Sequence, residues 1–455
     1  MEPIRLGDLF RNIGITRKPD VEVTSVSTDS RVIEPGSVFV AIKGEKFDGE
    51  DFVPSAVRKG AVAIVATRRF NDLDVEQIIV PDTKDALIRM AGNYRDMFDP
   101  KVVGVTGSVG KTTTKEMIAA IFEEFGRTLK NEGNQNNEIG LPSTIFSMSK
   151  ETELAVLEMG MNGRGDISKL TRAARPQAAV ITMIGLSHIE FLKSKENILK
   201  AKLEIVEGLP EHGVLVINGD DEMLMGARDS IDKEIATFAI KNLDCDVVAR
   251  DIISSNSGSE FTIYDRIGGT FKAFVPAVGE HNIRDAVAAY TVATRIGLDP
   301  ARSVKALENY RPAGMRQKIV PFNGMTVIED CYNANPDSMR ASLQMLSDLS
   351  VNGMKIAVLG DMLELGDISE EAHRSLGMFV AKCGIDILLC YGREMKACAK
   401  AATAAGVPCV AHFSDKEELA NYLAKTVNAG DAIVFKGSRG MMLEEIIQMF
   451  YEIRK

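Results

Sequence analysis

The chain lacks several features that would assign it to a large class of proteins. No apolar run approaches the roughly 20 residues that a membrane-spanning helix needs, so no membrane insertion is expected. The N-terminus has no basic stretch followed by an apolar core, as a secretory signal has, which predicts a cytoplasmic protein. The 6 cysteines show no Cys-x-x-Cys spacing, so we expect reduced, mostly buried thiols rather than a zinc site or a disulfide framework.

An excess of basic residues is also missing. The chain has 54 Lys and Arg against 64 Asp and Glu, for a net charge of −10. A general nucleic-acid binder must neutralise phosphates with many basic side chains, so no nucleic-acid partner is expected. An anionic substrate would therefore need basic groups gathered locally at its site.

The length and the order of patterns predict three α/β domains. A chain of 455 residues exceeds the size of a single growing core. Residues 1–98 contain short apolar runs broken by Gly, Pro and Asp, as in a small α/β domain. Residues 99–313 alternate strand and helix signals, which predicts a parallel sheet covered by helices, with an antiparallel extension over 246–278. Residues 314–455 are expected to form a Rossmann-like, doubly wound domain.

Five strand-like runs, separated by helical stretches, support this last prediction. They are Met325–Glu329, Lys355–Leu359, Ile385–Tyr391, Pro408–His412 and Ala432–Lys436.

The most informative segment is a strand, a glycine-rich turn and a helix beginning near residue 101. Lys101–Thr106 is apolar enough for a buried strand, and helical spacing starts at Lys111. Glycines in the turn allow close approach to phosphate, Lys111 can reach the β and γ phosphates, and the Thr112 hydroxyl can hold Mg²⁺. The segment therefore predicts ATP or GTP binding. The candidate residues are Gly107, Ser108, Val109, Gly110, Lys111, Thr112 and Thr113.

This turn departs from the common nucleotide-loop pattern. That pattern has a glycine five places before Gly110, where this chain has Val105. The loop is either a variant phosphate cradle or a glycine-rich turn with an incidental lysine.

Two further strand ends carry side chains that could act on a nucleotide. Glu158 ends one predicted parallel strand and His188 follows the next, so both are expected at the carboxyl edge of the sheet, where ligands bind. A carboxylate there suits Mg²⁺, although a solvated strand-end Glu158 and a structural His188 remain alternatives. The helical stretch 195–204 carries three lysines, and periodicity does not say which of them points inward.

With these motifs in this order, the chain resembles the Mur ligase family, whose ATP-dependent enzymes join an amino acid or dipeptide to the peptide stem of the bacterial cell-wall precursor. The family's loop has the Thr-Gly-x-x-Gly-Lys-Thr spacing, which accounts for Val105. The matching segments are Thr106-Gly107-Ser108-x-Gly110-Lys111-Thr112-Thr113, Asn136-Asn137-Glu138-Ile139-Gly140-Leu141-Pro142, Glu158-Met159-Gly160, Ser187-His188, Ala201-Lys202-x-Glu204, Gly279-x-His281-Asn282-x-x-x-Ala286 and Asp330-x-Tyr332-Asn333-Ala334-Asn335-Pro336.

Within the family, the likeness is closest to the members that add a dipeptide. It rests on the 330–336 segment, on Leu359-Gly360-Asp361-Met362-Leu363-Glu364-Leu365-Gly366, on His373 and on Phe435-Lys436-Gly437-Ser438-Arg439-Gly440-Met441. The Asp-Asn-Pro-Arg segment typical of the enzyme that adds the third residue does not occur. Glu329-Asp330 replaces the family's usual Asp-Asp or Asn-Asp pair, which leaves the match at Asp330 intact.

The resemblance implies an activity and its partners. We expect ATP to phosphorylate the terminal carboxylate of UDP-N-acetylmuramoyl-tripeptide and D-alanyl-D-alanine to displace the phosphate. Such a reaction belongs to peptidoglycan synthesis, hence to cell wall biogenesis, cell shape and cell division. A monomer is expected, and a closing motion is predicted because ATP-binding groups occur in two domains.

The resemblance also implies roles for individual residues. Lys111, His188 and Lys202 would be catalytic, with one Mg²⁺ at Thr112 and Glu158. A second Mg²⁺ would use His188 and a carbamylated Lys202, since the carbamate replaces a cation with oxygen ligands.

The remaining implied residues bind the nucleotide or the substrates. Asn282 would lie near the adenine, although it could equally cap a helix, and Asp330 could be a strand-end turn residue. Arg439 is a candidate for the dipeptide carboxylate. The other ATP candidates are Arg316 and Asn335, and the other substrate candidates are Ser30, Arg31, Lys43 and Asn137.

Three other functions are compatible with parts of the pattern. One is a related ligase that adds a single amino acid or acts on folate or cyanophycin. Another is a nucleotide switch or kinase, although the Asn-Lys-x-Asp segment of guanine readers is not found. A non-catalytic binding protein would leave Glu158, His188 and Lys202 without a shared purpose.

Overall fold

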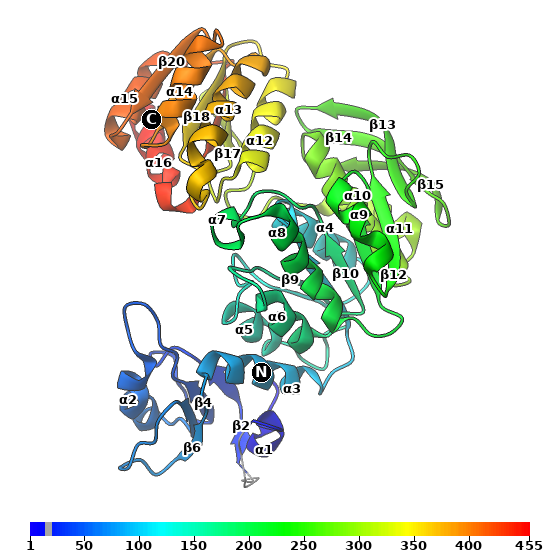
Figure 1. The fold of residues 1–455 in the computed structure, drawn as a ribbon, viewed down its shortest axis with the longest axis vertical. Helices are drawn as coiled ribbons and strands as arrows, with labels where there is room; N and C mark the ends of the chain where they lie inside the picture. The colour runs from blue at the N-terminus through cyan, green and yellow to red at the C-terminus, as the bar shows by residue number, and fades with distance from the viewer. Residues whose placement is uncertain (14–20) are drawn as a thin grey trace.

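The computed structural model describes residues 1–13 and 21–455, which form three α/β domains in a row. The N-terminal domain lies at the bottom of Figure 1, the central domain in the middle and the C-terminal domain at the top. The fold class predicted from the sequence is thus confirmed. No helix in the described ranges is long and apolar enough to cross a membrane.

The N-terminal domain is built on a four-stranded parallel sheet in the order β3-β4-β5-β6, beside a short antiparallel β1-β2 pair. α3 leads out of it and packs against α5 and α6 of the next domain. The elements are β1 (Ile4–Arg5), α1 (Leu6–Leu9), β2 (Glu22–Val23), β3 (Ser25–Ser27), β4 (Ser37–Val40), α2 (Val53–Arg58), β5 (Ala63–Ala66), β6 (Glu76–Ile79) and α3 (Thr83–Arg95).

The central domain has a nine-stranded sheet in the order β15-β14-β13-β12-β11-β10-β7-β9-β8. Its strands run parallel from β8 to β13, and β13, β14 and β15 pair antiparallel, as the change of pattern over 246–278 predicts. The strands are β7 (Lys101–Thr106), β8 (Thr128–Lys130), β9 (Leu154–Glu158), β10 (Ala178–Ile181), β11 (Val214–Asn218), β12 (Glu234–Ala239), β13 (Val247–Ser255), β14 (Gly258–Asp265) and β15 (Gly269–Val275).

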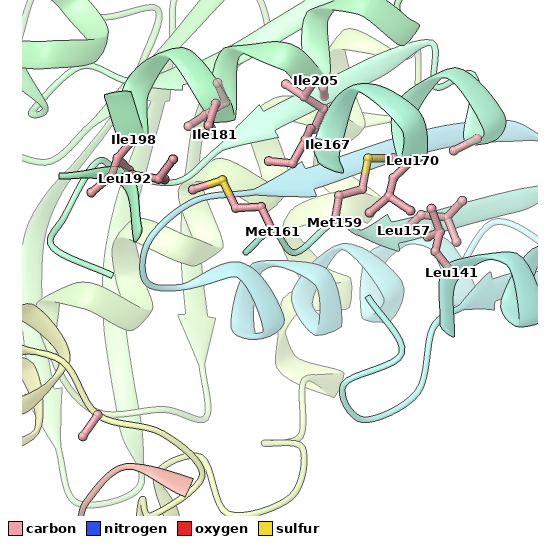
Figure 2. Packing of buried hydrophobic residues seen from close by; sticks show 14 of the residues in the cluster. Leu141, Leu157, Met159, Met161, Ile167, Leu170, Ile181, Leu192, Ile198 and Ile205 are labelled. Carbon is pink, nitrogen blue, oxygen red and sulfur yellow. The ribbon is translucent and has the colours of Figure 1, made fainter. Parts of the chain in front are cut away.

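Helices cover both faces of this sheet because its strands are apolar on both sides. α4 and α10 pack on one face, and α5, α6 and α8 cover the other, where Figure 2 shows interlocking Leu, Ile and Met side chains. The helices are α4 (Lys111–Glu123), α5 (Gly140–Ile145), α6 (Asp166–Ala174), α7 (Ile189–Leu192), α8 (Lys195–Leu203), α9 (Glu222–Ala227), α10 (Glu280–Arg295) and α11 (Pro300–Ala306).

The C-terminal domain has a six-stranded sheet in the order β16-β17-β21-β18-β19-β20. The strands are β16 (Lys318–Phe322), β17 (Met325–Glu329), β18 (Lys355–Gly360), β19 (Ile387–Tyr391), β20 (Cys409–Phe413) and β21 (Ala432–Lys436). The helices are α12 (Pro336–Asp348), α13 (Ser369–Lys382), α14 (Met395–Ala404), α15 (Lys416–Thr426) and α16 (Leu443–Ile453).

One strand of this domain was missing from the five predicted. β16 pairs antiparallel with β17 at the edge of the sheet and contains Pro321. Proline cannot donate a backbone hydrogen bond, so it is tolerated in edge strands, and it also weakens the sequence signal for a strand.

Candidate functional site

The glycine-rich turn lies between β7 and α4, at the carboxyl edge of the central sheet. Gly107 and Gly110 have positive φ angles of 151° and 86°. A Cβ on Gly107 would lie 1.8 Å from Thr182 Oγ1, and one on Gly110 would lie 2.5 Å from Asp285 Oδ1. Only glycine fits either position, so the loop presents bare backbone above the N-terminus of a helix, which favours anions.

Lys111 begins α4 and bends back over this loop. Its Nζ donates to the Gly107 carbonyl at 2.8 Å. Burial lowers the pKa of Lys111; the Glu158 carboxylate opposes this shift and the Arg316 charge adds to it. An anionic group bound in the loop would therefore replace the Gly107 carbonyl as the partner of Lys111 Nζ. It would also favour the charged form of the Lys111 amine.

Glu158 ends β9 directly beside the loop. Its side chain is 1% exposed. Oε2 accepts a hydrogen bond from Thr112 Oγ1 at 2.7 Å, and Oε1 accepts one from Asn136 Nδ2 at 2.7 Å. The Glu158 backbone N–H donates to Asn131 Oδ1 at 2.9 Å. The carboxylate is thus a fixed part of the site, not a solvated strand end.

These two oxygen donors fit a divalent cation. Magnesium keeps several waters and takes only one or two carboxylates from a protein. Thr112 and Glu158 place a hydroxyl and a carboxylate oxygen next to each other at the foot of the loop. In the described residues, no cluster of three or more His, Cys, Asp or Glu could hold a metal, so a site here depends on other donor types.

His188 lies between β10 and α7, with its backbone in the left-handed region at φ 61°. Its Nδ1 lies 3.3 Å from Glu364 Oε2 of the C-terminal domain. That contact holds the pKa of Glu364 below its ordinary value. The imidazole itself lines the cavity described below.

Lys202 is the lysine of α8 that points inward. It is 2% exposed, whereas Lys195 and Lys200 lie on the exposed side of the helix. Ile198, four residues earlier, is fully buried on the same face of α8 (Figure 2). Packing of this apolar residue therefore decides which lysine is buried.

The buried amine of Lys202 is held in an environment that disfavours its charge. Burial lowers its pKa well below the ordinary value, the Lys111 charge lowers it further, and Glu158 partly offsets both. A lysine in this position is a neutral amine at a lower pH than a free lysine, and a neutral amine is the form that reacts with carbon dioxide.

A cavity of about 440 Å³ opens between the central and C-terminal domains. The central domain contributes the loop and α4 from Ser108 to Thr113, together with Asn137, Glu158 and His188. The C-terminal domain contributes Arg316, Asp330, Asn335 and Lys436, among others. Tertiary structure thus gathers most of the sequence-predicted nucleotide residues around one space.

The C-terminal side of this cavity is held by polar contacts. The Arg316 guanidinium stacks on Tyr332, with its central carbon 3.9 Å from the ring centroid. Asp330 Oδ2 accepts a hydrogen bond from the buried Lys436 Nζ at 2.8 Å. Asn335 caps α12 through Ser338 N–H at 2.8 Å and donates from Nδ2 to Ser187 Oγ across the domain junction. Asp330 and Asn335 are thus fixed by the fold as well as available to a ligand.

Asn282 and Asn137 have local partners of their own. Asn282, in the first turn of α10, is buried and donates to the Val278 carbonyl at 2.8 Å and to Gln317 Oε1 at 2.7 Å, and it does not line the cavity. Asn137 Oδ1 accepts from Gly140 N–H at 2.9 Å, just before α5, and its residue lines the cavity.

Four predicted substrate residues lie outside the cavity. Ser30, Arg31 and Lys43 belong to the N-terminal domain, where Arg31 pairs with Asp29 and Lys43 Nζ lies 3.9 Å from Asp48. Arg439 follows β21, is 57% exposed and pairs with Glu444 at 2.6 Å. The structure does not bring these side chains together with the loop.

Two cavity residues were missed from the sequence. Burial raises the pKa of Asp285 to about 8, and this carboxyl packs under Gly110. The sequence feature that could have identified Asp285 is an acidic residue within the otherwise apolar stretch of α10. Lys436 lies in a segment used for the resemblance but was given no role, because its partner Asp330 is over 100 residues away.

Comparison with known proteins decides the family. Residues 22–95 match the Mur ligase family catalytic domain, 105–293 the Mur ligase middle domain and 315–439 the Mur ligase glutamate ligase domain. The UDP-N-acetylmuramoyl-tripeptide--D-alanyl-D-alanine ligase of Bacillus subtilis is 40% identical, with 96% of each chain covered. The chain belongs to the Mur ligase family. The ligase of the same name from Escherichia coli is 35% identical over 95% of each chain.

Solved structures agree with this membership. MurF from Acinetobacter baumannii superposes with a TM-score of 0.92 at 31% identity, covering 99% of both chains. MurF from Thermotoga maritima, solved in complex with ADP, has a TM-score of 0.85 at 29% identity and covers 94% of this chain and 97% of its own. The family resemblance seen in the motifs is therefore confirmed over the whole length of the chain.

Proposed function

We propose that this Mur ligase adds D-alanyl-D-alanine to UDP-N-acetylmuramoyl-tripeptide, with ATP as the energy source. One observation carries the proposal: a glycine loop, Lys111 and the Thr112–Glu158 pair face Arg316 and Asp330 across a single cavity. The names of the relatives specify the two substrates, and the ADP in a solved relative supports the nucleotide.

The reaction forms an amide in two displacements. A carboxylate oxygen of the tripeptide attacks the γ phosphorus of ATP, the bond to the bridging oxygen breaks, and ADP leaves. The dipeptide amine then attacks the acyl carbon, the bond from that carbon to the phosphate oxygen breaks, and the amine loses a proton. The loop N–H groups and Lys111 stabilise the charge that moves between the phosphoryl oxygens, which is the main contribution a protein makes to phosphoryl transfer.

Two residues of the site fit Mg²⁺, which when bound supplies positive charge to the phosphate oxygens. Thr112 would bind it through the hydroxyl and Glu158 through the carboxylate or an intervening water. Asn136 holds the second oxygen of Glu158, so the carboxylate keeps its orientation.

Lys202 is proposed to be carbamylated and to join His188 at a second Mg²⁺. Its burial, its lowered pKa and the lack of a hydrogen bond or ion pair to the amine among the described residues all fit a lysine whose native form is modified. The carbamate would turn an amine that repels a cation into an oxygen ligand.

The proposed domain limits are 1–98 for UDP-sugar binding, 99–313 for ATP binding and 314–455 for the incoming dipeptide and the rest of the ATP site. Ser30, Arg31 and Lys43 would bind the uridine diphosphate, and Asn137 the tripeptide side of the cavity. Arg439 would bind the dipeptide carboxylate after exchanging its present partner Glu444. Asn282, Arg316, Asp330 and Asn335 are proposed to bind the nucleotide.

The proposed setting is the cytoplasm, where ATP and UDP-sugars are made, with the enzyme acting as a monomer. Through the peptidoglycan precursor it would serve cell wall synthesis, cell shape and cell division.

A product assay tests this function. The purified protein is incubated with ATP, Mg²⁺, D-alanyl-D-alanine and UDP-N-acetylmuramoyl-tripeptides that carry either diaminopimelate or lysine at the third position. We expect a product heavier by one dipeptide minus water, with ADP and phosphate in equal amounts. Single amino acids serve as the competing acceptors. Ligation of a single amino acid but not of the dipeptide would refute the assignment.

A further inference from the structure

The motif Leu359 to Gly366 spans the end of β18 and the loop that follows it, and the mechanism above gives it no role. Its first half is anchored deep in the C-terminal domain. Asp361 Oδ1 accepts from Met395 N–H at 2.8 Å, and Met362 N–H donates to His373 Nε2 at 3.1 Å. Leu363 N–H donates to Ser438 Oγ at 2.9 Å. Three successive residues are thus held by buried partners.

His373 serves this anchoring alone. It is fully buried, and its Nδ1 lies 2.7 Å from the Ser369 carbonyl, which can only accept. Nδ1 therefore carries the proton, and Nε2 is left to accept from Met362. His373, in α13, thus fixes the loop and does not reach a substrate.

The anchored loop projects Glu364 towards the central domain. Glu364 Oε2 lies 3.3 Å from His188 Nδ1, and the Glu364 carbonyl accepts from Glu190 N–H at 3.4 Å. Gly366, at the end of the loop, lies directly against Glu190. The contact is made with α7, which sits just beneath the C-terminal domain in Figure 1.

Both partners adopt a backbone conformation that is costly for their residue types. Glu364 and His188 each have a φ of 61°, in the left-handed region that non-glycine residues rarely occupy. Such strain persists where the surroundings impose it, and it gathers at functional sites. Here the two strained residues, on different domains, are the two that meet.

Among the described residues, His188 Nδ1 is buried and has no hydrogen-bond partner, although Glu364 Oε2 lies 3.3 Å away. We propose that Glu364 is a positioning residue for ligation: it crosses from the C-terminal domain and closes this short gap to accept a hydrogen bond from Nδ1, so that Nε2 is presented to the cavity. This inference rests on the proposed function. His188 lines the cavity, whereas Glu364 is not among the described side chains that do so, and the carboxylate therefore acts through the imidazole. Carboxylates that hold the far nitrogen of a functional histidine fix its tautomer and its ring orientation.

The first test is spectroscopic and needs no substrate. The chain has only 5 histidines, so ring-nitrogen NMR of the histidine-labelled full chain gives few signals, and His188→Gln identifies the one that matters. In the wild type we expect the His188 proton on Nδ1. Glu364→Gln should change the His188 signal and leave the others unchanged. An unchanged His188 signal would overturn the proposal.

The second test separates positioning from structure and from direct substrate contact. Glu364→Gln is expected to lower kcat by about 10- to 100-fold, the usual effect of losing such a partner, with KM for the dipeptide unchanged. Glu364→Asp, which keeps the charge, should recover part of the loss. A raised KM with unchanged kcat would mean that Glu364 binds the dipeptide itself, which refutes the proposal.

Stability and coupling complete the design. Glu364→Gly relieves the positive φ, so it should unfold at the wild-type temperature or above while kcat falls. In a protein that already carries His188→Gln, the further substitution Glu364→Gln should not lower kcat again. If the two substitutions acted independently, their effects on kcat would multiply, which would contradict the proposal that Glu364 acts through His188. Glu190→Gln removes a neighbouring exposed carboxylate and serves as the matched control with wild-type kcat. A wild-type enzyme without ligase activity would refute the proposed function but leave the spectroscopic result to decide the pairing.

Discussion

The close approach of Asp285 to the phosphate loop makes a quantitative prediction at Gly110. In Gly110→Ala, the new Cβ would lie 2.5 Å from Asp285 Oδ1, 3.0 Å from Oδ2 and 3.1 Å from Cγ, at a backbone φ of 86°. A left-handed conformation costs a residue with a Cβ about 1 to 2 kcal/mol. Overpacking a buried contact costs about 1 to 3 kcal/mol. We expect Gly110→Ala to lose about 2 to 5 kcal/mol of stability in sum.

A second substitution separates these two contributions. Asp285→Ala removes all three atoms that the new Cβ would meet. In the double variant the overpacking cost should disappear and the backbone cost should remain, so stability should recover by about 1 to 3 kcal/mol relative to Gly110→Ala after correction for Asp285→Ala alone.

The assay is denaturant unfolding of the wild type, Gly110→Ala, Asp285→Ala and the double variant, with ADP binding measured by calorimetry on each. Gly163→Ala is the matched control, since no atom lies within 4 Å of its Cβ and its φ is not positive. Both glycines belong to the central domain. A double variant that recovers no stability would refute the claim that the Asp285 carboxyl excludes a side chain at position 110.

Three further predictions concern ionisable groups of the site. Lys111→Ala should abolish ligation and leave the unfolding temperature unchanged within a few degrees, which product assay and calorimetry together check. The folded-state pKa of Asp285, about 8, lies above its ordinary value of 3.8, so the protonated carboxyl stabilises the fold at low pH and this contribution is lost as pH rises through 8. The unfolding temperature of the wild type should therefore fall between pH 5 and pH 8, and that of Asp285→Asn should fall less. An identical fall in both proteins would contradict the raised pKa of Asp285. In protein prepared without carbamylation, the Lys202 amine is buried without a hydrogen bond to any described residue, at a cost of about 1 to 3 kcal/mol, so Lys202→Met should be more stable than this unmodified wild type. Product assay should find Lys202→Met inactive in ligation, whereas an active variant would exclude a role for Lys202.

The sequence was sufficient for the parts of the site that depend on local order. The strand, the glycines and the helix around Lys111 are consecutive, so their spacing alone places backbone donors at a helix N-terminus. Glu158 and His188 follow parallel strands, and parallel strands bring their carboxyl ends to one edge. That rule predicted both at the carboxyl edge of the sheet, and both line the cavity there.

Other parts of the site depend on contacts that no local pattern contains. Three lysines of α8 were equivalent in sequence, and the burial of Ile198 on the same helix face selects Lys202. Asp285 is an unremarkable acidic residue of α10 until that helix packs beneath Gly110. The edge strand β16 was missed because Pro321 is compatible with a strand only where one side is unpaired.

The sequence by itself determined the fold class, the nucleotide loop and the family, because each is encoded by short-range spacing and by the order of motifs along the chain. Only the tertiary structure decided which ionisable groups are buried and which residues meet across domains, such as His188 with Glu364 and Asp330 with Lys436. Burial and proximity belong to packing between distant segments. Charge, pKa and the reach of a side chain therefore become defined only when those segments are in contact.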